Sequence, residues 1–531
     1  MQRLLSIFVW VVIGSSALLE CRVGAITIGA GQESQLTNAL NAGVTVFELT
    51  GQVTLSRPLV ISTNVVMQGV SSNLAILSGN FKHRIFVVGS GGVLTLSNLT
   101  LINGRQTSTN SENGGVVQSG GGAIYNDRGT VLINGCVLSG HTVIGATGLA
   151  GTGSGPGQNG GHAFGGAIFN NQGTVLLNAS TLIANTVFAG AGGKGVDGSD
   201  VGLGQNGTKG GDSGQAAGGA IYSWGGRLGI ENSIVSSNSV SGAPSGKQGL
   251  GGGLLGFSAL PGSVIPAAGG AVYGDGHLVL SIVASQINGN TVTNAPGWTG
   301  LTGKTEKPGG SGSAGGSSFG GGIYSNSRLT LTGTSFSNNW VGGGPGGSGG
   351  QGGSSLFSLA GGDGGSGGNA IGGAVFNGEA GVAMAQSCFF DNNLVLGGPG
   401  GAGGAGNNPN AKLGKLGATG LSSGSSLANQ TGSFTLGNLN SGDVMIPTNV
   451  FGSFKNLPSQ RIDYSIGGTV LSLKASTAFV GAEVQVTTNL NTINTPWTTL
   501  DGRFVLVNTS AVYNVVLPSN TNVTYIYRLK Y

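Results

Sequence analysis

The densest group of ionisable side chains in the sequence is Lys82, His83 and Arg84, at the start of the apolar segment RIFVV. A cationic patch of this kind can hold an acidic sugar, and a lysine or arginine within it can act as the base of a polysaccharide lyase. The same three residues would equally suit a solvated loop that precedes a strand. Lys82 and Arg84 are therefore the candidate catalytic residues, with a plain surface loop as the alternative.

Carboxylates are too dispersed to indicate a glycoside hydrolase. Such enzymes typically place two carboxyl groups about 5–10 Å apart across the scissile bond. No strand-like segment carries two carboxylates at positions i and i+2, and Asp127, Asp275 and Asp391 occupy different positions in their repeats. The histidines are scattered as well, without the convergent spacing of a metal site. The sequence therefore favours a protein without enzymatic activity and keeps a polysaccharide lyase or hydrolase as the alternative.

One glycine-rich segment has the spacing of a calcium-binding repeat. Residues 192–197 read GGKGVD and match the first six positions of the GGxGxD nonapeptide. The eighth position of that nonapeptide carries a large apolar residue, but Ser199 stands there, and such sites occur in tandem copies. Asp197 is therefore a candidate calcium ligand, and the sequence indicates no other cofactor.

Three tryptophans, Trp224, Trp298 and Trp340, fall at or near junctions between apolar and glycine-rich segments. Aromatic rings stack on the apolar faces of sugars, so these residues are candidates for a glycan-binding face. Alternatively, each ring covers apolar surface at the base of its glycine-rich loop. A polysaccharide or a cell-surface ligand is the partner that these residues predict.

These candidates lie on a chain that repeats itself. A segment of the form GGAIY recurs six times, and successive copies begin 44, 53, 51, 51 and 52 residues apart. A fixed period of about 20–50 residues indicates a solenoid, in which each unit packs on its neighbours. The paired glycines predict a tight backbone turn that leads into each strand. The copies open at Gly121, Gly165, Gly218, Gly269, Gly320 and Gly372.

The segments between the glycines read as short β-strands. Their apolar runs are β-branched, bounded by turn residues and too short for core helices. We therefore predict an all-β, right-handed parallel β-helix over residues 26–430, with an amphipathic helix over 33–43 that caps its open end. Asparagines at the coil corners are expected to bend the chain and to bond along the stack. They are Asn185, Asn238, Asn290, Asn338 and Asn392.

The GGAI segments, together with the FxxN segments Phe336–Asn339 and Phe390–Asn393, resemble the repeats of polymorphic outer-membrane proteins. Those proteins are surface-exposed autotransporter passengers with a pectin-lyase-like (pectate-lyase-like) right-handed parallel β-helix. The resemblance covers roughly residues 120–400. It implies the same fold and a bacterial cell-surface location.

Glycine recurs at every third position in the insertions between the coils, for example at Gly192, Gly195 and Gly198. Three residues per turn is the period of polyproline II, and glycine at every third residue allows such helices to pack closely. We predict that successive insertions leave the same corner of successive coils and lie side by side as left-handed helices. Flexible glycine–serine linkers are the alternative.

Residues 431–531 return to strand-like patterns without the glycine repeat. Alternation over 483–488 and 524–529 predicts half-buried antiparallel strands and hence a small C-terminal β-sandwich. The segment EVQVTTNLNTINTPWTTL, with the closing YIYRLKY, resembles C-terminal β modules of secreted proteins from environmental Gram-negative bacteria.

Residues 1–25 have the order of a secretory signal peptide, with Arg3 before an apolar run and small residues at its end. No later apolar run reaches about 18 residues, so we expect no transmembrane helix in the mature chain. Charged residues make up 8% of the chain, and no Lys/Arg cluster is large enough to follow a phosphate backbone, which argues against nucleic acid as a partner. The sequence therefore predicts an exported adhesin or structural protein, secreted or held at the outer-membrane surface, that binds glycans or another surface.

Overall fold

The computed structural model describes residues 25–108, 120–201, 204–252, 257–304, 307–436 and 450–453, followed by the backbone of the C-terminal strands. Residues 1–24 of the predicted signal peptide lie outside the described part. The chain divides into two units, a larger one that holds most residues up to Phe434 and a smaller one that holds the C-terminal strands. Each unit is described by itself.

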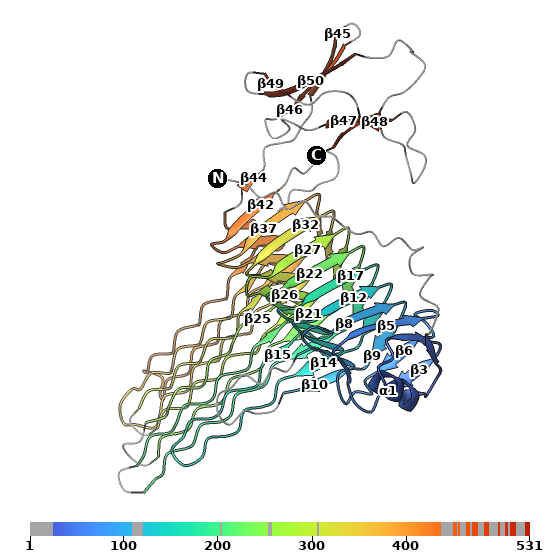
Figure 1. Cartoon of the computed structure of the whole chain (residues 1–531). Coiled ribbons are helices and arrows are strands. Elements are labelled where there is room, and N and C mark those ends of the chain that lie inside the picture. Colours follow the sequence, from blue (N-terminus) through green and yellow to red (C-terminus); the bar gives the residue numbers. More distant parts are fainter. Residues whose placement is uncertain are drawn as a thin grey trace. The chain divides into compact units, whose positions relative to one another are not determined.

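The larger unit is a right-handed parallel β-helix, as predicted (Figure 1). Its short strands stack as five parallel sheets, A to E, within the described residues. Helix α1 (Glu33–Asn41) lies at the N-terminal end, where Leu36 is fully buried. Each repeat contributes one strand to each sheet in the order C, A, B, D and E, so the glycine-rich insertions fall between sheets D and E.

Sheets A and B contain the longest series of strands after sheet C is set aside, and their strands are as follows in chain order. Sheet A holds β1 (Ile26–Ile28), β2 (Val46–Leu49), β5 (Asn64–Gly69), β8 (Val93–Ser97), β12 (Thr130–Asn134), β17 (Thr174–Asn178), β22 (Arg227–Glu231), β27 (Val279–Val283), β32 (Arg328–Thr332), β37 (Val382–Gln386), β42 (Ser433–Leu436) and β44 (Lys455–Asn456). Sheet B holds β3 (Gln52–Thr54), β6 (Ile76–Ser78), β9 (Thr100–Ile102), β13 (Val137–Ser139), β18 (Thr181–Ile183), β23 (Ile234–Ser236), β28 (Gln286–Asn288), β33 (Ser335–Ser337) and β38 (Phe389–Asp391).

The other three sheets complete the coils. Sheet C holds β4 (Leu59–Ile61), β7 (Phe86–Val88), β11 (Ile124–Asp127), β16 (Ile168–Asn171), β21 (Ile221–Trp224), β26 (Val272–Asp275), β31 (Ile323–Ser325), β36 (Val375–Asn377), β41 (Leu427–Asn429) and β43 (Val450–Phe451). Sheet D holds β10 (Arg105–Thr107), β14 (Thr142–Ile144), β19 (Thr186–Phe188), β24 (Ser239–Ser241), β29 (Thr291–Thr293), β34 (Trp340–Gly342) and β39 (Leu394–Leu396). Sheet E holds β15 (Ala163–Phe164), β20 (Ala216–Ala217), β25 (Ala267–Ala268), β30 (Ser318–Phe319), β35 (Ala370–Ile371) and β40 (Ser422–Ser423).

Strand alternation places the core inside the coils. In sheet A, Val131 pairs in register with Val175, and Val175 pairs with Leu228, so buried side chains stack on one another along the helix axis. The six repeat-opening glycines all have φ between +60° and +75°, a left-handed conformation that suits glycine best. A turn of this kind directs the chain from sheet E into sheet C.

Buried asparagines form an amide ladder inside one corner. Asn185 Nδ2 donates to Asn238 Oδ1 at 2.9 Å, Asn238 repeats this bond to Asn290, and the ladder continues to Asn339 and Asn393. The predicted combination of bending and stacking in one asparagine is found at Asn338 and Asn392, which have positive φ and are joined by a bond from Asn392 Nδ2 to Asn338 Oδ1 at 2.7 Å. At Asn185, Asn238 and Asn290 the stacking is found without the bend. The bend falls on the preceding residue, which has positive φ: Ala184, Ser237, Gly289, Asn338 and Asn392. Asn338 and Asn392 thus form an exposed step of amide bonding beside the ladder, and the ladder positions next to them are Asn339 and Asn393.

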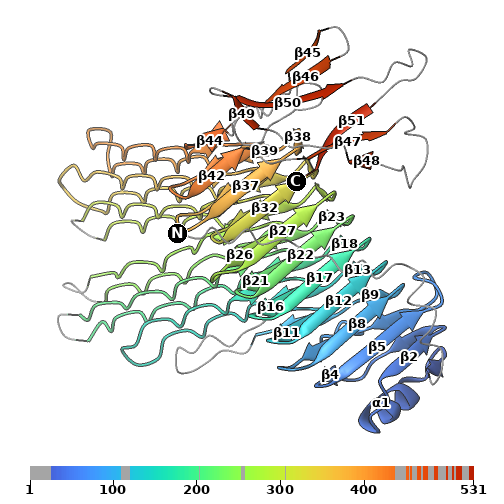
Figure 2. The same cartoon turned by 45° about the horizontal axis from the view of Figure 1, so that its top comes forward.

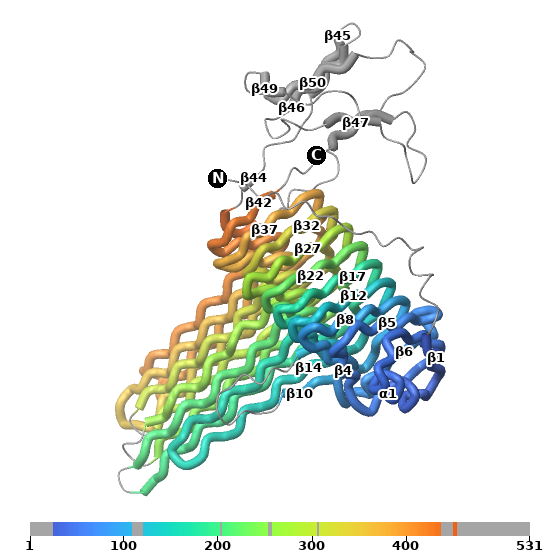
Figure 3. Tube along the Cα trace, viewed as in Figure 1, coloured from blue at the N-terminus to red at the C-terminus, as the bar shows by residue number. Residues whose placement is uncertain are grey.

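The glycine-rich insertions leave one side of the β-helix and lie side by side (Figures 1 and 3). They cover residues 145–162, 189–215, 242–266, 294–317, 343–369 and 397–421. Each consists of an outgoing and a returning stretch, and glycine N–H groups donate to carbonyls of neighbouring stretches. Gly192, Gly195 and Gly198 donate to Pro244, Lys247 and Leu250 at 3.0, 2.9 and 2.7 Å. The bonds thus recur every third residue, which is the period expected for packed polyproline II helices.

The first three and the last three insertions form two groups (Figure 2). Ser245 and Gln248 occupy the third insertion at register positions where the second insertion has Gly192 and Gly195. The third and fourth insertions therefore contact each other partly through side chains. Trp298 Nε1 donates to Ser245 O at 2.8 Å, and the Lys307 ammonium lies 4.2 Å from the centre of the Phe257 ring.

The smaller unit contains antiparallel strands, as the alternating sequence predicted. One sheet has the order β45 (Asp463–Gly467), β46 (Val470–Ala475), β50 (Ser510–Val516) and β49 (Val505–Val507). A second sheet has the order β48 (Thr498–Thr499), β47 (Glu483–Thr487) and β51 (Ile526–Lys530). Val484 pairs with Leu529 between β47 and β51.

Candidate functional site

A row of stacked aromatic rings lies on the side of sheet C that faces away from the coil interior, where Phe164, Ala217 and Ala268 of sheet E pack against it. The second residue of each strand from β11 to β36 points outward, because the first residue packs in the core. Adjacent ring centroids lie 5.3, 5.1, 4.9, 4.7 and 5.2 Å apart, and the rings are within 13° of parallel. The rings belong to Tyr125, Phe169, Tyr222, Tyr273, Tyr324 and Phe376.

A second, more polar row lies two residues further along the same strands. The strand register aligns Asp127, Asn171, Trp224 and Asp275 on successive coils. Asn171 Nδ2 donates to Asp127 Oδ1 at 2.8 Å, and Asn326 Nδ2 donates to Asp275 Oδ1 at 3.2 Å. The Trp224 side chain is 44% exposed between them. We call the two rows together the aromatic strip.

Burial keeps the phenols of the strip neutral at physiological pH. It raises the pKa of Tyr222 and Tyr273, and it raises the pKa of Tyr324 to about 12. The Tyr273 hydroxyl donates to Asp275 Oδ2 at 3.4 Å. Phe169, Tyr273 and Phe376 are buried, so the exposed part of the strip is Trp224 beside carboxylate and amide groups, which can bind hydroxyl groups.

Arg84 closes the N-terminal end of the strip. Its guanidinium carbon lies 4.9 Å from the centre of the Tyr125 ring, a cation–π distance. Desolvation lowers the pKa of Arg84, and burial followed by the Asp127 charge raises the pKa of Tyr125. Arg128 and Asp127 form an exposed ion pair at 3.2 Å. Of the two candidate catalytic residues, Arg84 thus belongs to the strip, whereas Lys82 is an exposed residue on the turn before β7.

The three candidate tryptophans lie on three different parts of the fold. Trp224 is in β21 on the strip, Trp298 is in the fourth insertion, and Trp340 is in β34 of sheet D. Trp340 is partly buried, and its ring lies close to Gly342. Of these three tryptophans, only Trp224 therefore joins the aromatic strip.

The Asp197 carboxylate is engaged with neighbouring protein groups. Lys194 Nζ donates to Asp197 Oδ2 at 2.7 Å, and the Leu250 N–H donates to Oδ1 at 2.8 Å. The bond from Lys194 lowers the pKa of Asp197. Among the described residues, no three His, Cys, Asp or Glu side chains gather as a metal-ligand set.

The aromatic strip was not among the predicted sites, although its signal is present in the sequence. Each GGAIY segment ends in tyrosine or phenylalanine, and these are the six rings of the row. The polar row was harder to find, because Asp127, Asn171, Trp224 and Asp275 differ in type and align only when the coils stack in register.

Comparisons with protein-family models, curated proteins and solved structures gave no match. Within the described residues, no helix has the length and apolar character needed to cross a membrane.

Proposed function

We propose that this protein is an exported, non-enzymatic β-helix, a surface or secreted adhesin, that binds glycan chains along the aromatic strip. The observation that carries the proposal is the exposed Trp224 indole, aligned between Asn171 and Asp275 on neighbouring coils. A sugar ring can place its apolar face on the indole while its hydroxyls bond to the amide and the carboxylate.

The rest of the strip supports binding to a chain rather than to a single sugar. Neighbouring strands in a sheet lie about 4.8 Å apart, so equivalent side chains recur at a fixed spacing along the axis. The stacked rings beneath hold the outer row in place, which reduces the entropy lost on binding. The resemblance of the GGAI segments to polymorphic outer-membrane proteins supports a bacterial cell surface as the location.

Retention on a panel of neutral and acidic polysaccharides tests the proposal. Trp224→Ala should weaken retention on the order of tenfold, which corresponds to about 1.4 kcal/mol. Trp340→Ala is the matched control, because it removes the same side chain from sheet D. Equal retention of both variants and the parent protein would refute binding at the strip.

A polysaccharide lyase is the second candidate, favoured by one observation. Arg84, whose pKa is lowered by desolvation, lies against Tyr125, and Asp127 is on the same strand. A base and a carboxylate at one end of a glycan-binding strip would suit proton abstraction from an acidic sugar. Chain cleavage in the same panel, abolished by Arg84→Gln but retained in Lys82→Gln, would favour this function over binding alone.

A further inference from the structure

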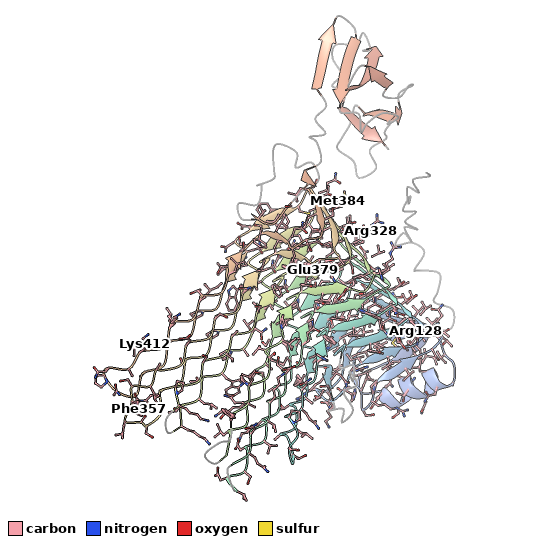
Figure 4. The ribbon with its side chains drawn as sticks, turned by 90° about the vertical axis from the view of Figure 1, so that its left-hand side faces the viewer. Arg128, Arg328, Phe357, Glu379, Met384 and Lys412 are labelled. Atoms are coloured by element: carbon pink, nitrogen blue, oxygen red, sulfur yellow. The ribbon has the colours of Figure 1, made fainter. Side chains whose placement is uncertain are left out.

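The outer end of the last two insertions carries large apolar side chains in water. Leu356 and Phe357 lie at the turn of the fifth insertion and are 101% and 71% exposed. Leu413 and Leu416, in the returning stretch of the sixth insertion, are 74% and 75% exposed. Figure 4 shows Phe357 and Lys412 at the end of the insertions that is furthest from the coils. We call residues 354–359 and 407–416 the distal tip.

The register of the glycines explains why these leucines face outward. Gly414 and Gly417 point into the bundle and donate to Gly404 O and Gly401 O at 2.9 and 2.8 Å. In the fifth insertion, the residues equivalent to Leu413 and Leu416 are Gly361 and Gly364, which donate to carbonyls of the sixth insertion. The sixth is the last insertion of the repeat, so its leucines occupy the face where the stack of insertions ends.

Hydrogen bonds hold the two turns of the distal tip together. Asn407 Nδ2 donates to Phe357 O at 2.9 Å, and its Oδ1 accepts the Leu359 N–H at 2.8 Å. Ser358 Oγ donates to Asn408 Oδ1 at 3.2 Å. The exposed apolar side chains therefore stand on a backbone that is fixed by its neighbours.

Exposed cations accompany these apolar side chains. The sequence KLGKLG at 412–417 places Lys412 and Lys415 beside the two leucines, and both lysines are exposed. Asp363 lies nearby and accepts the Lys415 backbone N–H at 2.7 Å. Among the described residues, the ion pairs of the insertions are Lys194–Asp197 and Lys209–Asp212, both in the second insertion. The lysines of the distal tip are thus available to an external anion.

We propose that the distal tip docks on an anionic lipid surface. Leu356, Phe357 and the two leucines enter the boundary between headgroups and acyl chains, and the lysines contact lipid phosphates. Aliphatic side chains favour an apolar phase over a hydroxyl-rich glycan, and several large apolar side chains left exposed on one part of a surface mark an interaction site. This inference does not depend on glycan binding by the strip.

Vesicle flotation of the full chain tests the inference. The parent protein should float with vesicles of phosphatidylglycerol and phosphatidylcholine, and weakly with phosphatidylcholine alone. The double variant Leu356→Ser/Phe357→Ser should lose at least tenfold in partitioning at any salt concentration. Lys412→Gln/Lys415→Gln should lose mainly the preference for the anionic lipid and its sensitivity to salt.

Matched controls come from the second insertion. Val201 is 84% exposed, so Val201→Ser removes an exposed apolar group away from the distal tip, and Lys194→Gln removes a paired lysine. Both controls should float like the parent protein. Flotation that is equal in parent and tip variants, or absent in the parent, would overturn the inference. Loss of polysaccharide retention in the tip variants, with unchanged flotation, would assign the tip to a glycan instead.

Discussion

The coils and the insertions of this protein both pack tightly, but the coils pack through apolar side chains and the insertions pack through glycine backbone. In the coils, strands present Leu, Ile, Val and Phe side chains to a closed interior, and Phe336 is fully buried there. In the insertions, backbone packs directly on backbone, because a Cβ on Gly347 or Gly365 would overlap the carbonyl oxygen of Trp298 or Ser313. Both regions pair their polar backbone groups between successive repeats.

The two kinds of packing place different requirements on the sequence. A side-chain core depends on volume, so its positions tolerate exchange among apolar residues of similar size. A backbone core depends on the absence of Cβ at every third residue, and its outward positions are open to almost any side chain. The lysines, leucines and aromatic residues of the insertions can therefore vary in type without loss of packing.

The largest expected effect on stability comes from opening a cavity in the coils. Phe336 stacks on Phe390 with ring centroids 5.1 Å apart, and Phe336→Ala should lower the free energy of unfolding by about 3–5 kcal/mol. Phe389→Ala is the control, because Phe389 precedes Phe390 in β38 on the next coil and is 40% exposed. Denaturant unfolding measures both variants. Equal effects would contradict a closed side-chain interior.

Removing one step of the buried amide ladder should have the next largest effect. Asn238 Oδ1 accepts both the backbone N–H and the side-chain Nδ2 of Asn185, at 3.0 and 2.9 Å. Asn238→Ala leaves these buried donors without that acceptor, which costs about 1–3 kcal/mol for each buried polar group left unpaired. Asn178→Ala removes an exposed amide bond of the same kind and should change stability by less than about 0.5 kcal/mol. Thermal unfolding of the pair checks the difference.

His141 should make the coils sensitive to acid. It starts the amide ladder in place of asparagine: Nδ1 accepts the Gly104 N–H at 2.9 Å, and Nε2 lies 3.0 Å from Leu101 O. Burial lowers its pKa to about 3, well below the value of about 6.5 in an unfolded chain. Stability is therefore complete above about pH 6.5 and falls as the pH drops towards 3, by at most about 1.4 kcal/mol per pH unit.

The variant His141→Asn isolates this contribution, because asparagine can make the same two bonds without titrating. Denaturant unfolding between pH 7 and pH 4 should show a shallower loss of stability in the variant than in the parent protein. Identical slopes would mean that other groups account for the acid sensitivity.

The smallest effect on the stability of the coils is expected when a glycine of the insertions is replaced by alanine, which adds one methyl group. Gly365→Ala should leave coil unfolding within about 0.5 kcal/mol of the parent protein, because each repeat contacts only its neighbours. Amides such as Gly347 N–H, which donates to Ser313 O at 2.9 Å, should nevertheless exchange at least about tenfold faster with solvent. Ser366→Ala, on the exposed side of the same stretch, should change neither quantity. Unaltered exchange in Gly365→Ala would show that the backbones do not pack as closely as described.

Some features of the fold and of the site could be predicted from the sequence, and others could not. The GGAIY period predicted the stacked coils, whereas the row of rings formed by its final aromatic residue was not predicted. Which of two neighbouring asparagines joins the buried ladder was not predictable, because residues such as Asn338 and Asn339 are identical in type and differ in conformation and burial. Likewise, Arg84 and Tyr125 lie far apart in the chain, and only the pairing of β7 with β11 brings them together.

The sequence by itself determined the fold class and the chemistry of packing, because strand alternation and glycine spacing are local properties of the chain. The tertiary structure decided which residues share a surface. Asn171, Trp224 and Asp275 lie some fifty residues apart from one another and become neighbours through the register of successive coils. Leu413 and Leu416 are exposed because their insertion ends the stack, which depends on where the repeat stops and not on the residues themselves.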